Sequence, residues 1–261
     1  MTDVRIATWL ELQEALFENA WRGEISRHRS QFVFRGVPRS VHGLETSLQQ
    51  GAFEAHERHL LTSFRKYASR EQVVYDSVWN WLSLAKHHGL PTRLLDWSYS
   101  PYVALHFATH NFAHFDEDGA IWCVDFRKTN ELLPKALRKL LDTEDVNILT
   151  TEMLGRAATS LSEFDALSDH EFVVFFEPPS LDERIVNQFA LFSLPSRATL
   201  SLESLLASRP NTHRRIIIPA AMKWEIRDKL DQANITERVL FPGLDGLSQW
   251  LKRYFTTRNQ A

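Results

Sequence analysis

The chain has 261 residues, of which 44% are hydrophobic and 24% charged; this composition excludes a disordered or fibrous protein and suffices for one large domain or two small ones. The formal net charge of −3 excludes a surface that is basic overall, as in a general nucleic-acid coat, but leaves room for a local basic groove. The single cysteine, Cys123, excludes internal disulfides and a cysteine-rich zinc site, and the absence of a ~20-residue apolar run or a signal-peptide pattern predicts a soluble cytoplasmic protein without a membrane span.

The first part of the chain alternates predicted helices with short extended segments. Thr8 is the predicted N-cap of the first helix, with Glu11 as its capping-box partner. Gly89 is predicted to end a later helical region, and Ser100 with Pro101 begins the next helix. In chain order we predict a helix over 8–22, a strand over 31–36, one long or two shorter helices over 53–88, an extended segment over 90–97 and a helix from 100.

The second part continues with strands and helices. A turn at 118–119 leads into a strand, and two prolines stop a strongly apolar strand before residue 178. The predicted elements are a strand over 120–125, helices over 131–141 and 145–168, a strand over 172–177, a turn of helix that continues as a strand over 184–192, a strand over 214–219 and helices over 221–232 and 244–256. Strands that cluster with helices on both sides favour an α+β fold in a single domain, with a variable helical insertion near 128–170.

The tripeptide Phe34-Arg35-Gly36 ends the first predicted strand and is the first candidate site. A guanidinium next to a residue without a side chain permits close approach of a diphosphate or a ribose. The alternative is an arginine that pairs with a carboxylate at a sheet edge.

The segment from residue 87 to residue 100 is the second candidate, because it concentrates polar groups between two helices. Two histidines lie at a helix C-terminus, where the dipole favours their charged form, and the free N–H groups at the start of the next helix suit a phosphate. The polar residues are His87, His88, Thr92, Arg93, Asp96, Ser98 and Ser100. The alternatives are an ion pair between Arg93 and Asp96 and a role of Ser100 as a helix cap alone.

The third candidate is the segment 183–192. As a strand it would place Gln188, Ala190 and Phe192 on one face, where the Gln188 amide could hydrogen-bond a substrate. The alternative is a cross-strand amide bond.

Metal and standard nucleotide motifs are missing. His106 and His110 stand four residues apart on one predicted helix, but no third ligand is evident, so we expect surface histidines and no metal site. The chain has no P-loop and no GxGxxG, HExxH or GxSxG motif.

The three candidate segments together resemble the FRG domain family, which is named for its first tripeptide. The matching residues are Phe34-Arg35-Gly36, the block from His88 to Trp97 followed by Ser100-Pro101-Tyr102-Val103-Ala104-Leu105, and Arg184-Ile185 with Gln188 and Phe192. The resemblance covers roughly residues 25–250 and predicts a single FRG-type domain over 1–261. The chain departs from the family at Ala190, where glycine is frequent.

The order of these blocks also resembles the ADP-ribosyltransferase core. That resemblance implies a mainly antiparallel sheet with a central split, flanked by helices, and NAD as the co-substrate. Arg35 would then bind the phosphates or the nicotinamide ribose, Thr92 would lie near the Ser/Thr motif, and Gln188 would lie near the late-strand motif that carries the catalytic glutamate. Because Gln188 is neutral, the alternatives for the negative charge are Glu183, Glu177 and Asp96.

The resemblance leads us to expect an intracellular, NAD-dependent ADP-ribosyltransferase that acts as a toxin or defence effector on RNA, DNA or protein, with a neutralising antitoxin as a partner. The alternatives are a module that binds a nucleotide or phosphate without turnover, and a purely structural cluster. The expected catalytic residues are Arg35, Asp96 and Gln188, and the expected cofactor-binding residues are Phe34, Arg35, Gly36, His88, Thr92, Arg93, Ser100 and Arg184. Candidates for a basic patch toward a nucleic-acid acceptor are Arg65, Lys66, Arg214, Arg215 and Arg253.

Overall fold

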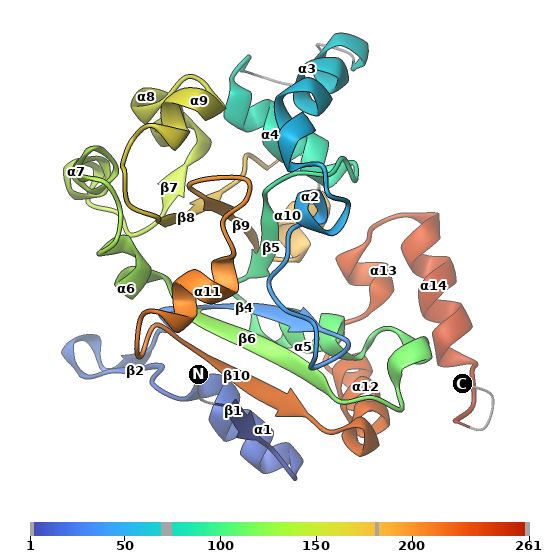
Figure 1. Cartoon of the computed structure of the whole chain (residues 1–261). Helices are drawn as coiled ribbons and strands as arrows, with labels where there is room; N and C mark the ends of the chain where they lie inside the picture. Colours follow the sequence, from blue (N-terminus) through green and yellow to red (C-terminus); the bar gives the residue numbers. More distant parts are fainter. Residues whose placement is uncertain (1–2, 69–74, 181–182, 259–261) are drawn as a thin grey trace.

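An eight-stranded, mostly antiparallel sheet forms the centre of the computed structural model, which describes residues 3–68, 75–180 and 183–258 (Figure 1). The strand order is β1-β10-β6-β4-β5-β9-β8-β7, and the pairs at the two edges, β1 with β10 and β7 with β8, are parallel. The bounds are β1 (Asp3–Arg5), β4 (Phe32–Val37), β5 (Leu95–Ser98), β6 (Gly119–Asp125), β7 (Leu149–Thr150), β8 (Val173–Glu177), β9 (Ala190–Pro195) and β10 (His213–Ile218). The predicted mainly antiparallel sheet with flanking helices is confirmed.

The pairing between neighbouring strands is shortest at the centre of the sheet. β4 and β5 share one residue pair, Phe34 with Ser98, whereas β4 pairs with β6 from Phe32 to Val37. A regular antiparallel ladder would continue until Gly36 lies opposite Asp96, but the two strands separate before that point. The sheet therefore consists of two four-stranded halves that one residue pair between β4 and β5 connects.

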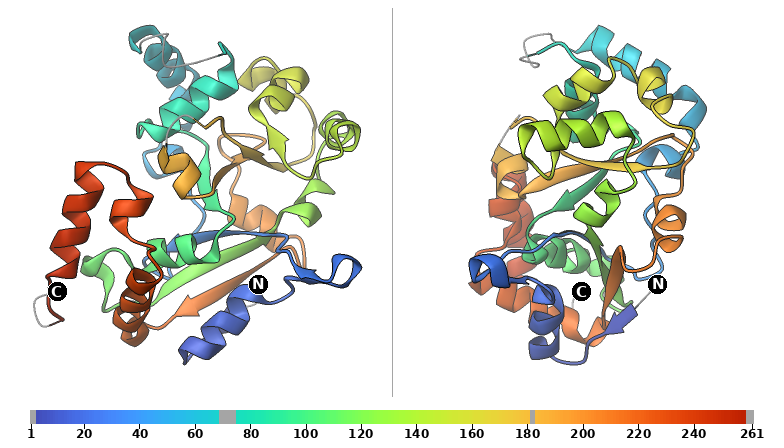
Figure 2. Two further views of the ribbon diagram at one scale, coloured as in Figure 1. Left: turned by 180° about the vertical axis from the view of Figure 1, so that it is seen from behind. Right: turned by 90° about the vertical axis from the view of Figure 1, so that its left-hand side faces the viewer.

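Helices cover one face of each half. On β4, β6 and β10 lie α1 (Trp9–Phe17), α5 (Pro101–Thr109) and α12 (Lys223–Gln232). Over β8 and β9 lie α3 (Glu57–Tyr67), α4 (Val78–His87), α7 (Lys135–Glu144), α8 (Thr151–Ala157) and α9 (Leu161–Asp165). The two further views show these groups gathered over opposite ends of the molecule (Figure 2).

A second apolar core joins the halves on the other face of the sheet. It contains Val33, Trp97, Trp122 and Phe175, and α11 (Leu202–Ala207) covers it. Side chains alternate along a strand, so neighbouring residues of β6 serve both cores, Trp122 this one and Cys123 the other. The remaining elements are the hairpin of β2 (Trp21–Arg22) and β3 (Arg27–His28), the helices α2 (Ser47–Gln50), α6 (Phe126–Asn130), α10 (Glu183–Asn187), α13 (Glu237–Leu240) and α14 (Leu244–Tyr254), and short 3-10 turns at Gly23–Ile25, Glu54–His56, Phe112–His114 and Ala220–Met222.

Local signals predicted several element ends. Thr8 caps α1, Ser100 caps α5 with Pro101 at the first position, and Gly89 takes a left-handed φ of 82° after α4. The prediction of one helix over 8–22 is wrong, because α1 ends at Phe17, Asn19 takes a φ of 60°, and the chain turns into β2. The segment 145–168 contains the edge strand β7 before its two helices.

Candidate functional site

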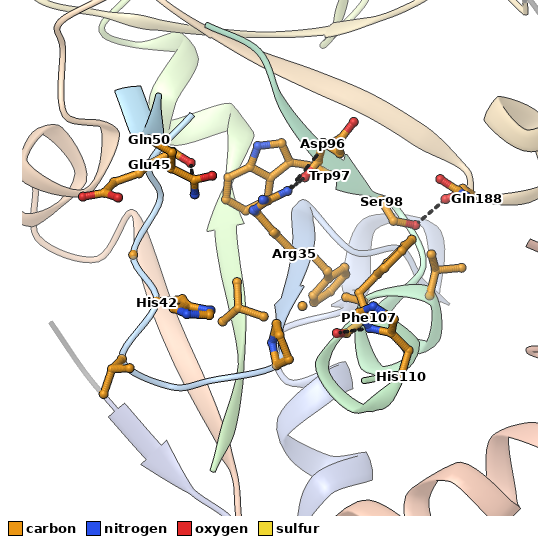
Figure 3. Close-up of a pocket in the computed structure, with 18 of the residues that line it drawn as sticks. Arg35, His42, Glu45, Gln50, Asp96, Trp97, Ser98, Phe107, His110 and Gln188 are labelled. Atoms are coloured by element: carbon orange, nitrogen blue, oxygen red, sulfur yellow. Dashed lines mark hydrogen bonds and ion pairs between the residues drawn. The ribbon is translucent and has the colours of Figure 1, made fainter. Parts of the chain in front are cut away.

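A cavity of about 450 Å³ opens where β4 and β5 separate (Figure 3). Its wall comes from β4, the segment 38–50 that follows β4, β5, α5, and residues 184 and 188. Arg35, Asp96 and Gln188 all line it, although they are far apart in the sequence. The structure thus brings together the three residues that were expected to be catalytic.

Arg35 lies at the point where the strands separate. Its Nη1 donates to the backbone oxygen of Asp96 at 2.8 Å, on the edge of β5 from which β4 has separated, and lies 3.8 Å from the Asp96 carboxylate. Its Nε is buried and has no hydrogen-bond partner among the described residues. A buried donor without a partner is costly, so this nitrogen is a place where an acceptor on a ligand would be stabilised. Desolvation lowers the pKa of the Arg35 guanidinium and Asp96 opposes that shift.

Cations outnumber carboxylates around Asp96. Lys86, in the last turn of α4, places Nζ 2.9 Å from the Asp96 carboxylate, and the Arg184 guanidinium lies over the ring of Phe241 at 4.8 Å. Desolvation raises the pKa of Asp96, but the charges of Lys86 and Arg35 more than offset it, so the pKa lies below its usual value. Asp96 is therefore ionised at neutral pH, and the positive charge in excess of it suits an anionic ligand.

A smaller hollow of about 230 Å³ adjoins the cavity. Asp96, Arg184 and Gln188 line both spaces, and Lys86 lines the smaller one. The carboxylate of Asp96 thus stands at the boundary between two compartments.

Gln188 lies in the turn after α10 and not on a strand. The predicted turn of helix that continues as a strand is confirmed, because α10 runs to Asn187 and β9 begins at Ala190. Gln188 therefore does not share a strand face with Ala190 and Phe192, as it would if the whole segment were a strand. The Gln188 backbone oxygen accepts from Ser98 Oγ at 2.7 Å, and its side-chain Nε2 donates to the Leu240 carbonyl at 2.9 Å. These bonds tie the cavity edge to β5 and to α13.

Gly36 serves helix packing. A Cβ built on Gly36 would lie 1.7 Å from the carbonyl oxygen of Ala104, so α5 already fills the space that the missing side chain leaves. Gly36 also lines the cavity, so the approach of α5 is a second reason for a residue without a side chain at this position. Phe34, one residue before Arg35, is buried against the same helix and contributes to the cavity wall.

Four other expected ligand-binding residues lie outside the cavity wall. His88 lines a shallow hollow beside α3, and Ser100 accepts from the Val103 amide as the cap of α5. Thr92 is buried, and its hydroxyl accepts from the Leu94 amide at 3.3 Å. The contacts of these residues are those of structural groups.

Arg93 is the fourth residue outside the wall. It is 2% exposed, and its guanidinium donates to Glu57 of α3 at 2.7 Å and to Asp165 of α9 at 2.6 Å. The alternative of an ion pair between Arg93 and Asp96 is therefore wrong. Arg93 instead joins α3, α9 and the chain leading into β5.

The sequence did not reveal several residues of the wall. His42, Glu45 and Gln50 come from the segment after β4, which has no periodic pattern (Figure 3). Phe107 on α5 and His110 at its C-cap could have been predicted, because they follow Val103 at helical spacing. Desolvation lowers the pKa of both His42 and His110.

The positions of the acidic side chains show which of the candidates for the catalytic carboxylate, Asp96, Glu177 and Glu183, lies in the cavity wall. Asp96 and Glu45 line the cavity, and the side chain of Asp96 is 55% exposed. Glu177 lies at the end of β8 and accepts from the Tyr99 hydroxyl at 2.8 Å, while Glu183 lines a separate surface hollow. Of the three carboxylates considered from the sequence, Asp96 is the one in the wall.

His106 is not a surface histidine. It is fully buried, and its Nδ1 accepts from Nη1 of Arg227 at 2.9 Å. Burial and the charge of Arg227 hold the pKa of His106 well below its usual value, so the ring is neutral. His110 is exposed, as predicted, and the described residues contain no group of three metal-ligating side chains.

Fold and site together define a mixed α/β chain with a cation-rich cavity at the junction of two half-sheets. Residues 30–117 match the family model of the FRG domain, so the chain carries an FRG domain over this segment. The match includes β4, β5 and α5, with Arg35 and Asp96, and ends before Arg184 and Gln188. No match was found among curated proteins or among solved structures. Within the described residues no helix is both long and apolar enough to span a bilayer.

Proposed function

We propose that the cavity binds NAD and that the chain is an NAD-dependent ADP-ribosyltransferase that modifies a macromolecule. The observation that carries the proposal is the convergence of Arg35, Arg184 and Asp96 on one cavity. Its volume of about 450 Å³ falls within the range of ~300–1,000 Å³ common for small-molecule sites. The order of the FRG segments along the chain, which resembles the ADP-ribosyltransferase core, supports the choice of NAD.

In this proposal the cations bind the diphosphate of NAD. The free Nε of Arg35 donates to a phosphate oxygen, and Arg184 adds a second positive charge. The aromatic ring of Phe107 and the wall beside His42 provide a place for a ring of the dinucleotide. Binding through both ends fixes the nicotinamide ribose beside Asp96.

The chemical step follows from the charge of Asp96. The bond between C1′ of the ribose and N1 of nicotinamide breaks, N1 keeps the electron pair, and positive charge develops on the ribose. An ionised carboxylate stabilises that charge. A nucleophile of the acceptor then bonds to C1′ and releases its proton, for which Glu45 is a carboxylate base in the same wall.

Release of nicotinamide tests this proposal. The purified chain is incubated with NAD and a cell extract, nicotinamide is measured by chromatography, and labelled adenylate is followed into macromolecules. The proposal requires both signals from the wild type and their loss in Asp96→Asn. A folded wild-type sample that releases no nicotinamide and labels no macromolecule would contradict it.

A module that binds the nucleotide without turnover is the second candidate. The ion pair of Lys86 with Asp96 favours it, because a carboxylate that is already neutralised stabilises a developing cation less well. Calorimetry that detects NAD binding, with intact NAD recovered afterwards, would favour this candidate over the transferase.

Action as an intracellular toxin or defence effector, with an antitoxin partner, is part of the same proposal. We expect induced expression in a bacterial host to slow growth, and expression of Asp96→Asn not to. Equal growth inhibition by both chains at equal protein levels would contradict a role of this cavity in toxicity.

A further inference from the structure

The β2–β3 hairpin projects from one end of the sheet (Figure 1). Its strands pair with each other and belong to a sheet separate from the large one. None of the residues 21–30 is buried. Ordering a segment costs conformational entropy that burial ordinarily offsets, so a hairpin without buried residues points to a contact outside this chain.

The hairpin carries positive charge in a chain whose net charge is −3. The segment contains three arginines, Arg22, Arg27 and Arg29, but only one acidic residue, Glu24. Among the described residues, no carboxylate forms an ion pair with any of these arginines. The bonds of Arg22 and Arg29 go to backbone oxygens, at 3.1 and 3.3 Å, which leave their charges uncompensated. The hairpin is therefore a cationic surface open to solvent.

An aromatic ring lies beside these charges. The side chain of Trp21 is 55% exposed and meets the ring of His28 edge-on at 5.1 Å. At the base of the hairpin, the backbone of Phe126 donates to the Gln31 carbonyl at 3.2 Å, and the exposed Arg127 follows it. The cationic surface thus continues from the hairpin onto the start of α6.

The basic residues proposed from the sequence do not form such a surface. In the structure Arg214 pairs with Glu18, Arg215 with Asp3, and Arg253 with Asp231 and Glu237. Arg65 on α3 pairs with Asp76, and Nζ of Lys66 lies over the ring of Tyr67, 5.4 Å from its centroid. Carboxylates of the chain thus compensate these four arginines, which leaves Lys66 as a single charge, whereas the three arginines of the hairpin have no carboxylate partner among the described residues.

We propose that the β2–β3 hairpin binds single-stranded nucleic acid. Arg22, Arg27 and Arg29 contact phosphates, and the ring of Trp21 stacks on a base. Proteins that bind single strands combine cations along the backbone with aromatic rings under the bases, and both are present here on ten consecutive residues.

The hairpin is followed in the chain by β4, which contributes Arg35 to the cavity wall. Arg29 is six residues before Arg35, which at ~3.3 Å per extended residue is at most about 20 Å. A single-stranded nucleic acid bound by the hairpin can thus reach the cavity, where it would accept the ADP-ribose group. This role as an acceptor site rests on the proposed function, whereas binding itself does not, because it is measured without NAD.

Fluorescence anisotropy with labelled 20-nucleotide single-stranded RNA and DNA, over a salt series from 50 to 200 mM, tests the surface. The variants are Trp21→Ala and the double variant Arg27→Ala/Arg29→Ala. The control is Arg138→Ala, an exposed arginine on α7. Circular dichroism verifies that each variant is folded.

We expect Trp21→Ala to weaken binding by about tenfold, because the loss of one base stack on an aromatic ring lowers affinity by that order of magnitude. The double variant lowers the slope of log K against log salt by about 1.4, since each phosphate contact to a single strand contributes ~0.7. Arg138→Ala leaves affinity and slope unchanged. No binding by the wild type at 50 mM salt, an equal loss in Arg138→Ala, or binding to phosphatidylserine vesicles in place of the oligonucleotides would overturn the proposal. NAD binding is measured on the same samples, so that a failure of nucleic-acid binding can be distinguished from a failure of the proposed NAD-binding function.

Discussion

In Arg35, Nη1 hydrogen-bonds within the protein, whereas Nε is available to a ligand. Nη1 bonds to the backbone of Asp96, whereas the buried Nε has no partner in the described part of the chain. The first bond holds the guanidinium in place before a ligand arrives. Nε can then bond to a ligand without the entropic cost of ordering the side chain, which a mobile surface arginine would incur on binding.

Replacing Arg35 separates binding from folding. We expect Arg35→Ala to lower the affinity for NAD by about 10- to 100-fold, because a charge-assisted donor to the diphosphate is lost. Titration calorimetry measures the affinity. The matched control is Arg39→Ala, since Arg39 follows in the same segment but pairs with Glu117 at 2.7 Å and does not line the cavity. Equal losses in the two variants would argue against Arg35 as the ligand-binding residue.

The charge of Asp96 sets the expected pH dependence. Lys86 and Arg35 outweigh desolvation and lower its pKa, so the ionised form persists to lower pH than in an isolated side chain, whose pKa is ~3.9. A depressed carboxyl pKa also stabilises the fold above the unfolded-state pKa, and this contribution is lost as the pH falls through the folded-state pKa. Asp96 therefore stays ionised from pH 7 to pH 5, and its titration should not change the rate of nicotinamide release over this range.

Lys86→Met provides the comparison for this profile. Removing the closest cation raises the pKa of Asp96, so the acid limb of the profile moves to higher pH. The measurement is nicotinamide release against pH, with circular dichroism at each pH to exclude unfolding. An acid limb at the same pH in both chains would show that Asp96 does not control it.

At the scale of elements, α5 is packed closely onto β4 at Gly36. A Cβ at this position meets backbone atoms of Ala104 and Ala108, which cannot move without the helix. We expect Gly36→Ala to lower the free energy of unfolding by about 2–3 kcal/mol, as overpacking commonly does. Urea denaturation measures it. Gly23→Ala is the control, because nothing lies within 4 Å of the Cβ that it adds, and a loss as large in this variant would contradict the argument.

Arg93 links three elements and predicts a second stability effect. Its guanidinium satisfies Glu57, which is 4% exposed, and also Asp165. Arg93→Ala leaves the Glu57 carboxylate buried without its partner, so we expect a loss of about 3–5 kcal/mol in the free energy of unfolding. Urea denaturation again provides the value, and a loss below about 1 kcal/mol would show that the pair is not structural.

Elements with local signals were predictable and long-range partners were not. The caps at Thr8 and Ser100 and the stop at Gly89 depend on residues adjacent in sequence, and they lie where predicted. The role of Arg93 depends on Glu57, 36 residues earlier, and no local pattern indicates that pairing. The same reason explains why His42 and Glu45 were missed, since they reach the cavity through the path of an irregular segment.

At the scale of the whole molecule, the site depends on an interruption of the sheet. One continuous core on the face under α11 holds the halves together, while single pairing between β4 and β5 leaves the gap that becomes the cavity. The split and the convergence of Arg35, Asp96 and Gln188 are thus one feature. The residues that line it come from both halves, so the site exists only in the folded chain.

A crystal structure of the chain with NAD tests the central claim most directly. We predict density for the dinucleotide between β4 and β5, with a phosphate oxygen within hydrogen-bond distance of Arg35 Nε and the nicotinamide ribose beside Asp96. An empty cavity at saturating NAD, or NAD bound at another surface, would contradict the account.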